Sequence, residues 1–261
     1  MLIHPTFDQL RTLKLHGMAR AFSELSDNAS AAELDHAQWL ALLLDREEAD
    51  RNDRRLTYRL RNARLRHADA CIEDVDYRTP RRLDKSLFQQ LARGKWITAK
   101  QNLMIVGPCG VGKSWLACAL GQKACRDDYS VLYKRIPRMF AELEMGRADG
   151  RYPRLFRALT KANLLILDDW GPERLNADQR RDLMEIVEDR YRNASILITS
   201  QLPLAQWHDV IGEPTFADAI LDRIVHNAHR IELDGPSMRK IKADQNGLGS
   251  SHHNIDPAQG K

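Results

Sequence analysis

One segment of the chain has the residue types and the spacing of a phosphate-binding loop. The run Gly107-Pro108-Cys109-Gly110-Val111-Gly112-Lys113-Ser114 matches the pattern G-x-x-x-x-G-K-[ST]. It follows an apolar run and precedes a helical stretch over residues 115–126, which is the context that such a loop requires. Glycines let backbone N–H groups surround phosphate oxygens, Lys113 adds a positive charge, and Ser114 is a ligand for Mg²⁺. The sequence therefore predicts a nucleoside triphosphate site.

Two carboxylates follow a second apolar run. Residues 164–167 (LLIL) lead directly into Asp168 and Asp169, which places both acids at the carboxyl end of a buried strand. Ligands of open α/β sheets bind at this edge. We expect Asp168 to hold Mg²⁺ and Asp169 to orient or deprotonate the attacking water. Buried strands often end in Asp, but in combination with the upstream loop this pair indicates nucleotide hydrolysis.

Three further polar residues come later in the chain. Gln201 ends the run 196–201 (ILITSQ) and could reach a γ-phosphate, although a solvated strand end explains it equally well. Arg223 lies in an expected helix over 216–226, and Arg239 lies in the segment 235–240 (GPSMRK). Taken alone, each arginine is more typical of a protein surface than of a catalytic site.

Two basic segments are candidates for contact with a polyanion. The first, within an expected helix over about 35–68, has arginines on both borders of an apolar strip and contains no acid: Arg54, Arg55, Arg59, Arg61, Arg64 and Arg66. The second contains Arg151, Arg154, Arg157 and Lys161. Either segment can be a solvated helix face or a grip on phosphates. Aromatic residues are few in both, which favours sequence-independent duplex binding over base stacking.

The elements that must position these residues follow from the apolar pattern. Short apolar runs at 103–107, 130–134, 164–168, 195–199 and 229–233 alternate with helical stretches, which indicates a parallel sheet covered on both faces. Residues before about 75 show only helical patterns. We therefore expect an α/β P-loop NTPase domain over 76–245, a small all-helical domain over 1–75 and a flexible tail over 246–261.

Composition excludes several other classes of protein. The 261 residues include 40 basic and 36 acidic side chains, and no window approaches 18 uninterrupted apolar residues. Neither a membrane span nor a signal peptide is expected, which predicts a cytoplasmic protein. Four cysteines lack metal-binding spacing and are expected to be free thiols: Cys71, Cys109, Cys118 and Cys125. Trp96, just before the first apolar run, is expected to pack in the core rather than stack on adenine.

The order of these motifs resembles the IstB family, the ATP-dependent helpers of bacterial insertion-sequence transposition and relatives of the DnaC helicase loaders among the AAA+ ATPases. The resemblance implies an AAA+ core with a five-stranded parallel sheet, ATP and Mg²⁺ as cofactors, and assembly into a ring or spiral. It also implies duplex DNA and a cognate transposase as partners.

By the same resemblance, residues 107–114 bind the phosphates, Asp168 the metal and Asp169 the water. Gln201 resembles a γ-phosphate sensor, Arg223 an arginine finger that reaches a neighbour's nucleotide, and Arg239 a second sensor. Many AAA+ proteins have Glu where this chain has Asp169, so the shorter side chain puts the rate of hydrolysis in question.

Other functions fit parts of the pattern. A helicase loader acting in DNA replication has the same fold and is the main alternative. A P-loop kinase acting on a small metabolite would not need the arginines that follow residue 200. A purely structural DNA-binding protein would not need both Lys113 and Asp168.

Overall fold

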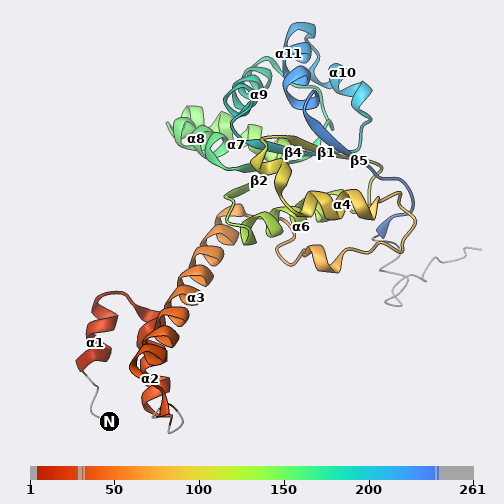
Figure 1. The fold of residues 1–261 in the computed structure, drawn as a ribbon. Coiled ribbons are helices and arrows are strands. Elements are labelled where there is room, and N and C mark those ends of the chain that lie inside the picture. Colours follow the sequence, from red (N-terminus) through yellow and green to blue (C-terminus); the bar gives the residue numbers. More distant parts are fainter. Residues whose placement is uncertain (1–4, 29–30, 32, 239, 241–261) are drawn as a thin grey trace, which may run out of the picture. The chain divides into compact units, whose positions relative to one another are not determined.

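The computed structural model describes residues 5–28, 31, 33–238 and 240, and the chain divides into two compact units, Met1–Arg61 and Asn62–Lys261 (Figure 1). This division lies inside a helix, upstream of the boundary near residue 75 that we expect from the sequence. Residues 62–75 therefore belong to the second unit, where the side chain of Arg126 donates two hydrogen bonds to Glu73 (2.9 and 3.0 Å).

The first unit is helical, as predicted. It contains α1 (Pro5–Thr12), α2 (His16–Ser26) and the larger part of α3 (His36–Ala63). The side chain of Glu47 joins α2 to α3, because its Oε2 accepts hydrogen bonds from the backbone N–H groups of Gly17 (2.8 Å) and Met18 (3.2 Å). Only glycine allows this approach, since a Cβ at Gly17 would lie 2.6 Å from the Cα of Glu47.

The expected helix over about 35–68 is too long at its carboxyl end. Helix α3 stops at Ala63, and Arg64 has a φ of 52°, a left-handed conformation that ends the helix. Arg64 and Arg66 therefore do not continue the two arginine rows that the sequence predicts along an unbroken helix.

The second unit contains a parallel sheet of five strands, as predicted. Its order is β2-β3-β4-β1-β5, and every neighbouring pair is parallel. The strands are β1 (Asn102–Val106), β2 (Val131–Arg135), β3 (Leu164–Trp170), β4 (Ser195–Ser200) and β5 (Ala228–Glu232). Because all carboxyl ends lie at one edge, the segments that follow β1, β3 and β4 meet there.

Helices cover both faces of this sheet (Figure 1). Helices α4 and α6 lie on one face, and α7, α8, α9 and α11 lie on the other. The bounds are α4 (Lys85–Ala92), α5 (Lys95–Thr98), α6 (Lys113–Arg126), α7 (Ile136–Ala148), α8 (Tyr152–Lys161), α9 (Ala177–Arg190), α10 (Trp207–Ile211) and α11 (Pro214–Val225).

Apolar side chains on both faces of the strands explain the near-continuous apolar runs in the sequence. Leu165, Leu167 and Ile198 belong to the core cluster with α7, α9 and α11. On the opposite face α6 packs closely against β3, because a Cβ at Gly121 would lie 2.7 Å from Cδ1 of Ile166. Trp96 is 3% exposed, and its indole N–H donates to the carbonyl of Leu91 (2.9 Å), which confirms that it packs in the core.

Local signals in the sequence set several helix starts. Asn176 and Gln179 form a reciprocal capping box at α9, and Asp84 and Glu213 cap α4 and α11. Pro153 lies in the first turn of α8, where the fixed φ of proline favours the helix. Among the described residues, no helix is both long enough and apolar enough to cross a membrane.

Candidate nucleotide site

The predicted phosphate loop follows β1 and ends in the first turn of α6. Gly110 and Gly112 have φ values of 88° and 95°, a backbone conformation that favours glycine, and they turn the chain into the helix. The ammonium of Lys113 donates hydrogen bonds to the carbonyls of Gly107 (2.7 Å) and Pro108 (2.8 Å) and is largely buried. These bonds hold the amine across the loop, where phosphates would replace the carbonyls as its acceptors.

Two distant segments enclose this loop. The backbone N–H of Met238 donates to the carbonyl of Gly110 (2.9 Å), and the side chain of Ser237 leaves no space for a Cβ at Gly110. From the other direction, Arg81 donates through Nη1 to the carbonyl of Val111 (2.9 Å). Arg81 is 2% exposed, and burial lowers the pKa of its guanidinium. The sequence gives no signal for this role, because Arg81 is one of several basic residues in the segment before β1.

Asp168 accepts more side-chain hydrogen bonds than Asp169, the other acid of the site. Its Oδ1 accepts hydrogen bonds from the hydroxyls of Ser114 (2.7 Å) and Thr199 (2.5 Å), and its Oδ2 accepts one from Tyr133 (2.6 Å). Burial raises the pKa of Tyr133, and the bond to Asp168 raises it further, so Tyr133 remains a donor. Nη1 of Arg66 lies 3.8 Å from Oδ2. The predicted pair Ser114 and Asp168 is thus brought together from α6 and β3.

The donors at this point suit a magnesium ion. A serine hydroxyl and a carboxylate are hard oxygen ligands, and Mg²⁺ in nucleotide sites takes few protein ligands besides the phosphates and water. Within the described residues, no group of three or more His, Cys, Asp or Glu side chains is arranged to hold a metal ion.

Asp169 is the next residue of β3, and its side chain forms a separate contact. Its carboxylate accepts a hydrogen bond from Arg135 at the end of β2 (2.6 Å). Its backbone has a φ of 70°, at an irregularity in the pairing of β3 with β4, and its N–H donates to the hydroxyl of Thr199 (3.1 Å). Thr199 therefore contacts both acids, although sequence analysis selects Gln201 from the same strand end.

The three later candidates differ in position. Gln201 is exposed directly after β4, beside the loop, because the N–H of Gly107 donates to the carbonyl of Ser200 (3.1 Å). Arg239 lies outside the described residues. Arg223 lies near the end of α11, before β5, and thus at the edge of the sheet opposite to the loop.

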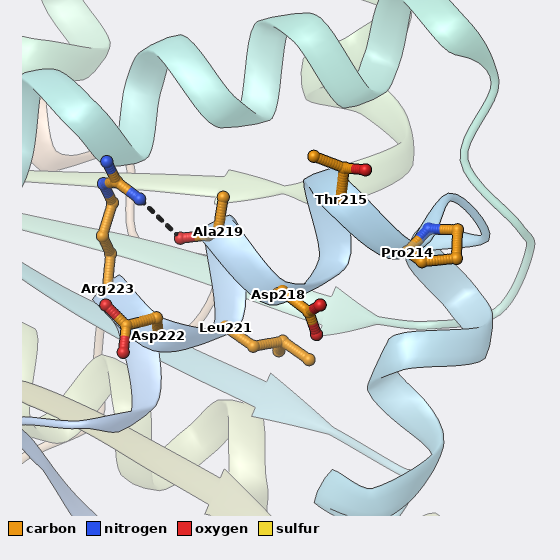
Figure 2. Close-up of a pocket in the computed structure, with 7 residues that line it drawn as sticks. All are labelled: Pro214, Thr215, Asp218, Ala219, Leu221, Asp222 and Arg223. Atoms are coloured by element: carbon orange, nitrogen blue, oxygen red, sulfur yellow. Dashed lines mark hydrogen bonds between the residues drawn. The ribbon is translucent and has the colours of Figure 1, made fainter.

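The side chain of Arg223 is held within its own unit. Nη1 donates to the carbonyl of Ala219 (2.9 Å), as Figure 2 shows, and Nε lies 2.7 Å from Oε2 of Glu188 on α9. The residues of α11 from Pro214 to Arg223 line an open groove in this region (Figure 2). This arrangement prevents Arg223 from contacting phosphates on the loop of the same subunit.

The two basic segments differ in how far acids neutralise them. In the first, Arg54 pairs with Asp50 (2.7 Å), Arg55 donates to Asn52, and Arg61 is exposed. In the second, Arg151 pairs with Asp149 (2.5 Å). The other three cations of that segment are exposed on α8, and no acid within the described residues pairs with them: Arg154, Arg157 and Lys161.

All four cysteines are free, as predicted. Cys109 is exposed in the phosphate loop, whereas Cys118 is buried in α6, where burial raises the pKa of its thiol to about 11.

The chain matches a known protein family. A family model described as IstB-like ATP binding protein matches residues 8–246. A relative from Sinorhizobium fredii, which carries the name insertion sequence ATP-binding protein, is 62% identical over 240 residues, covering 92% of this chain and 98% of its own.

Two solved structures show a similar fold. DnaI is similar with a TM-score of 0.56 and 24% identity, covering 65% of this chain and 92% of its own. The DnaC helicase loader is similar with a TM-score of 0.52 and 19% identity, covering 64% and 98%. The chain therefore shares the α/β fold of these proteins, as predicted.

Proposed function

Since the chain belongs to the family of IstB-like ATP-binding proteins of insertion sequences, we propose that it is an ATPase that assembles on duplex DNA and assists a transposase in target selection and transposition. The observation that carries this proposal is the division of the catalytic groups between opposite edges of one parallel sheet. Residues 107–114, Asp168 and Asp169 lie at the carboxyl edge, and Arg223 lies at the amino edge.

Hydrolysis at the carboxyl edge would use the chain's own residues in distinct roles. Backbone N–H groups of the loop and of the start of α6 bind the phosphates, and Lys113 transfers its hydrogen bonds from the loop carbonyls to phosphate oxygens. Ser114 and Asp168 would hold Mg²⁺, which would supply positive charge to neutralise the bound phosphates. Asp169 orients the attacking water once its carboxylate leaves Arg135. Gln201 and Arg239 are proposed to sense the γ-phosphate.

Arg223 supports a requirement for assembly. It lies at the far end of the strands from its own loop, so the phosphates it could stabilise are those bound to a neighbouring subunit. An arginine supplied in this way raises hydrolysis by orders of magnitude in other P-loop NTPases. The rate of ATP hydrolysis would then depend on assembly, and isolated subunits would hydrolyse ATP slowly.

Duplex DNA is the partner that the basic surface fits best. Arg154, Arg157 and Lys161 lie on one exposed face of α8 without acidic partners, which suits contact with a phosphate backbone. The arginines of the first segment, Arg54 to Arg66, remain candidates for a second contact. The transposase partner is supported by the insertion-sequence names of the relatives.

The test is the mass of the protein in solution with Mg-ATP, with and without a duplex of about one hundred base pairs, an arbitrary length well above any expected site. We expect a large complex only when ATP and DNA are both present. Lys113→Ala should lose ATP binding, whereas Arg223→Ala should bind ATP and fail to hydrolyse it. A protein that is monomeric under every condition would contradict the proposal and favour a helicase loader or a small-molecule kinase.

The DNA contact has a separate test. The slope of log affinity against log salt is negative. Changing Arg154, Arg157 and Lys161 together to Gln should make it less negative by about 2.7, or roughly 0.9 for each lost phosphate contact. The same change at Arg54, Arg55 and Arg61 tests the other basic segment. If that change alone weakens the salt dependence, the main contact lies on α3.

A further inference from the structure

A buried arginine contacts the backbone of the phosphate loop. The guanidinium of Arg81 bridges two segments, because Nη1 donates to the carbonyl of Val111 (2.9 Å) and Nη2 donates to the carbonyl of Asp76 (2.8 Å). Arg81 is 2% exposed, and within the described residues no carboxylate pairs with it. An arginine side chain keeps its charge even when it is buried. A positive charge therefore lies next to the loop with backbone carbonyls as its acceptors.

The side chain of Asp76 does not neutralise this charge. Its Oδ1 accepts hydrogen bonds from the N–H groups of Arg78 (2.7 Å) and Thr79 (3.3 Å), and its Oδ2 accepts one from the hydroxyl of Thr79 (2.5 Å). These bonds close a turn within its own segment. Burial lowers the pKa of Arg81, and the charge of Asp76 opposes this change only in part.

The contact with Val111 also fixes the direction of a loop N–H group. The carbonyl of Val111 and the N–H of Gly112 belong to one trans peptide group, in which the two bonds point in opposite directions. Because the carbonyl faces Arg81, the N–H of Gly112 faces away from it. Only glycine allows this approach, since a Cβ at Gly112 would lie 2.6 Å from Nη1 of Arg81. Backbone N–H groups of a phosphate loop are the groups that bind phosphate oxygens.

Two physical effects make this arrangement favour a bound polyphosphate. A cation at the carbonyl side of a peptide group polarises the group and strengthens its N–H as a donor. The uncompensated charge of Arg81 is costly while no anion is near, and a bound phosphate reduces that cost. Both effects disappear when the guanidinium is removed.

We propose that Arg81 is a positioning residue for the nucleotide, which holds the N–H of Gly112 toward the phosphates and adds positive charge behind it. The inference rests on the proposed nucleotide site and adds to it a residue from outside the loop. The N–H groups of such a loop contact the α- and β-phosphates, whereas its lysine reaches the β- and γ-phosphates. Arg81 should therefore affect the binding of ADP and the binding of ATP to the same extent.

Three variants separate this role from general charge and from folding. Arg81→Met keeps an unbranched side chain but removes the charge and the donors. Arg81→Lys keeps the charge, but a single ammonium cannot span the carbonyls of Val111 and Asp76 as the fork of a guanidinium does. Arg82→Met is the matched control, because Arg82 is the next residue, its side chain is 79% exposed, and its Nε lies 3.8 Å from Oδ2 of Asp234.

The first experiment measures affinity in the folded protein. ADP and a non-hydrolysable ATP analogue are titrated calorimetrically with Mg²⁺ into the full chain, at a temperature where urea denaturation shows each variant to be folded. We expect Arg81→Met to weaken the binding of both nucleotides about tenfold, the loss expected for one charge-assisted contact. Arg81→Lys should weaken both by a smaller factor, and Arg82→Met should bind both like the wild type.

Affinity separates a positioning role from a purely structural one. A residue that only stabilised the fold would lower the urea midpoint of Arg81→Met and leave the affinity of the folded protein unchanged, and that result would overturn the proposal. A loss confined to the ATP analogue, or an equal loss in Arg82→Met, would overturn it as well. If Arg81→Met does not fold, Arg81→Lys decides, because wild-type affinity in that variant would show that the bridge between the two carbonyls is not required and would overturn the proposal.

Hydrolysis with duplex DNA gives a second readout. Contacts with the α- and β-phosphates are made before and during the reaction, so Arg81→Met should raise KM for ATP about tenfold and leave kcat within about twofold of the wild type. A lower kcat with an unchanged KM would contradict the proposed role. If the wild type binds neither nucleotide, the proposed function fails together with this inference. If the wild type binds and hydrolyses ATP but Arg81→Met binds ADP normally, this inference alone fails.

Discussion

The hydroxyl of Thr199 forms a hydrogen bond with each of the two acids of the candidate site, Asp168 and Asp169. It donates to Oδ1 of Asp168 (2.5 Å) and accepts the backbone N–H of Asp169 (3.1 Å). Thr199→Val keeps the shape of the side chain but removes both hydrogen bonds. The buried carboxylate then loses one of its charge-assisted donors, and the N–H of Asp169 loses its acceptor.

The expected loss follows from these two contacts. A hydrogen bond to a charged group contributes about 1.5–3 kcal/mol, and an unpaired buried donor costs about 1–3 kcal/mol. Allowing for partial overlap, Thr199→Val should lower the free energy of unfolding by about 2–4 kcal/mol. For a unit of about 200 residues this corresponds to a decrease in Tm of about 4–16 °C.

Urea denaturation and ATP turnover together test this reasoning. Thr199→Ser is the control, because it keeps the hydroxyl and removes only a methyl group. We expect Thr199→Ser to hydrolyse ATP and Thr199→Val to be both less stable and slower at saturating ATP. If the two variants unfold at the same urea concentration, the hydroxyl does not hold the acids and the argument is refuted.

Three further predictions concern other contacts. Burial opposes ionisation of Glu47, but hydrogen bonds from Arg51 and the backbone hold its pKa below the ordinary 4.5. Ionised Glu47 therefore stabilises the fold above pH 4.5, and this contribution is lost as the pH falls through the lowered pKa of the folded protein. Glu47→Gln should therefore reduce stability at pH 7 but not near pH 3, as measured by thermal unfolding at both pH values; an equal loss at both would contradict the linkage. Gly17→Ala should destabilise the α2–α3 contact by about 1–3 kcal/mol, since a Cβ would overlap the backbone of α3. Gly150→Ala, which has open space around it but a φ of 77°, measures the cost of backbone strain without a clash. Arg135→Ala should free the carboxylate of Asp169 and raise the rate of ATP hydrolysis without DNA roughly fivefold, because a partly exposed ion pair is worth about 1 kcal/mol. A rate as low as that of Asp169→Asn would show that Arg135 assists the chemistry instead.

Local sequence pattern predicts the parts of the site that lie on one segment. The phosphate loop and Asp168 are recognisable because glycine spacing and apolar strands have direct backbone consequences. Tyr133, Arg135 and Thr199 are different, because they reach the acids from neighbouring strands. Their roles depend on the sheet order and on the register that pairs Arg135 with Asp168, and neither is encoded within a short window of residues.

For the helix that carries the first arginine segment, the local sequence pattern instead predicts more structure than the chain forms. A run of Arg, Leu and Ala without acids continues a helical pattern through residue 66, and the intrinsic propensities of these residues agree with it. The chain nevertheless turns at Arg64, and Arg66 contacts Asp168 instead of extending the row. Packing of Leu65 near α6 accompanies this turn, since a Cβ at Gly121 would lie 3.0 Å from its side chain. Tertiary contact overrides a local preference here.

Strand direction relates the proposed chemistry of this chain to its proposed assembly. Residues proposed to contact phosphate occur at both edges of the sheet: the loop with Lys113 at the carboxyl edge, and Arg223 at the amino edge. One nucleotide cannot contact both edges of the same subunit, but it can contact the carboxyl edge of one subunit and the amino edge of the next. Such a contact is head-to-tail, and repeating it produces a ring or an open helix. Glu188 pairs with Arg223 within the subunit. In the proposed assembly a neighbour's nucleotide replaces this partner, and ATP binding is then thermodynamically coupled to assembly.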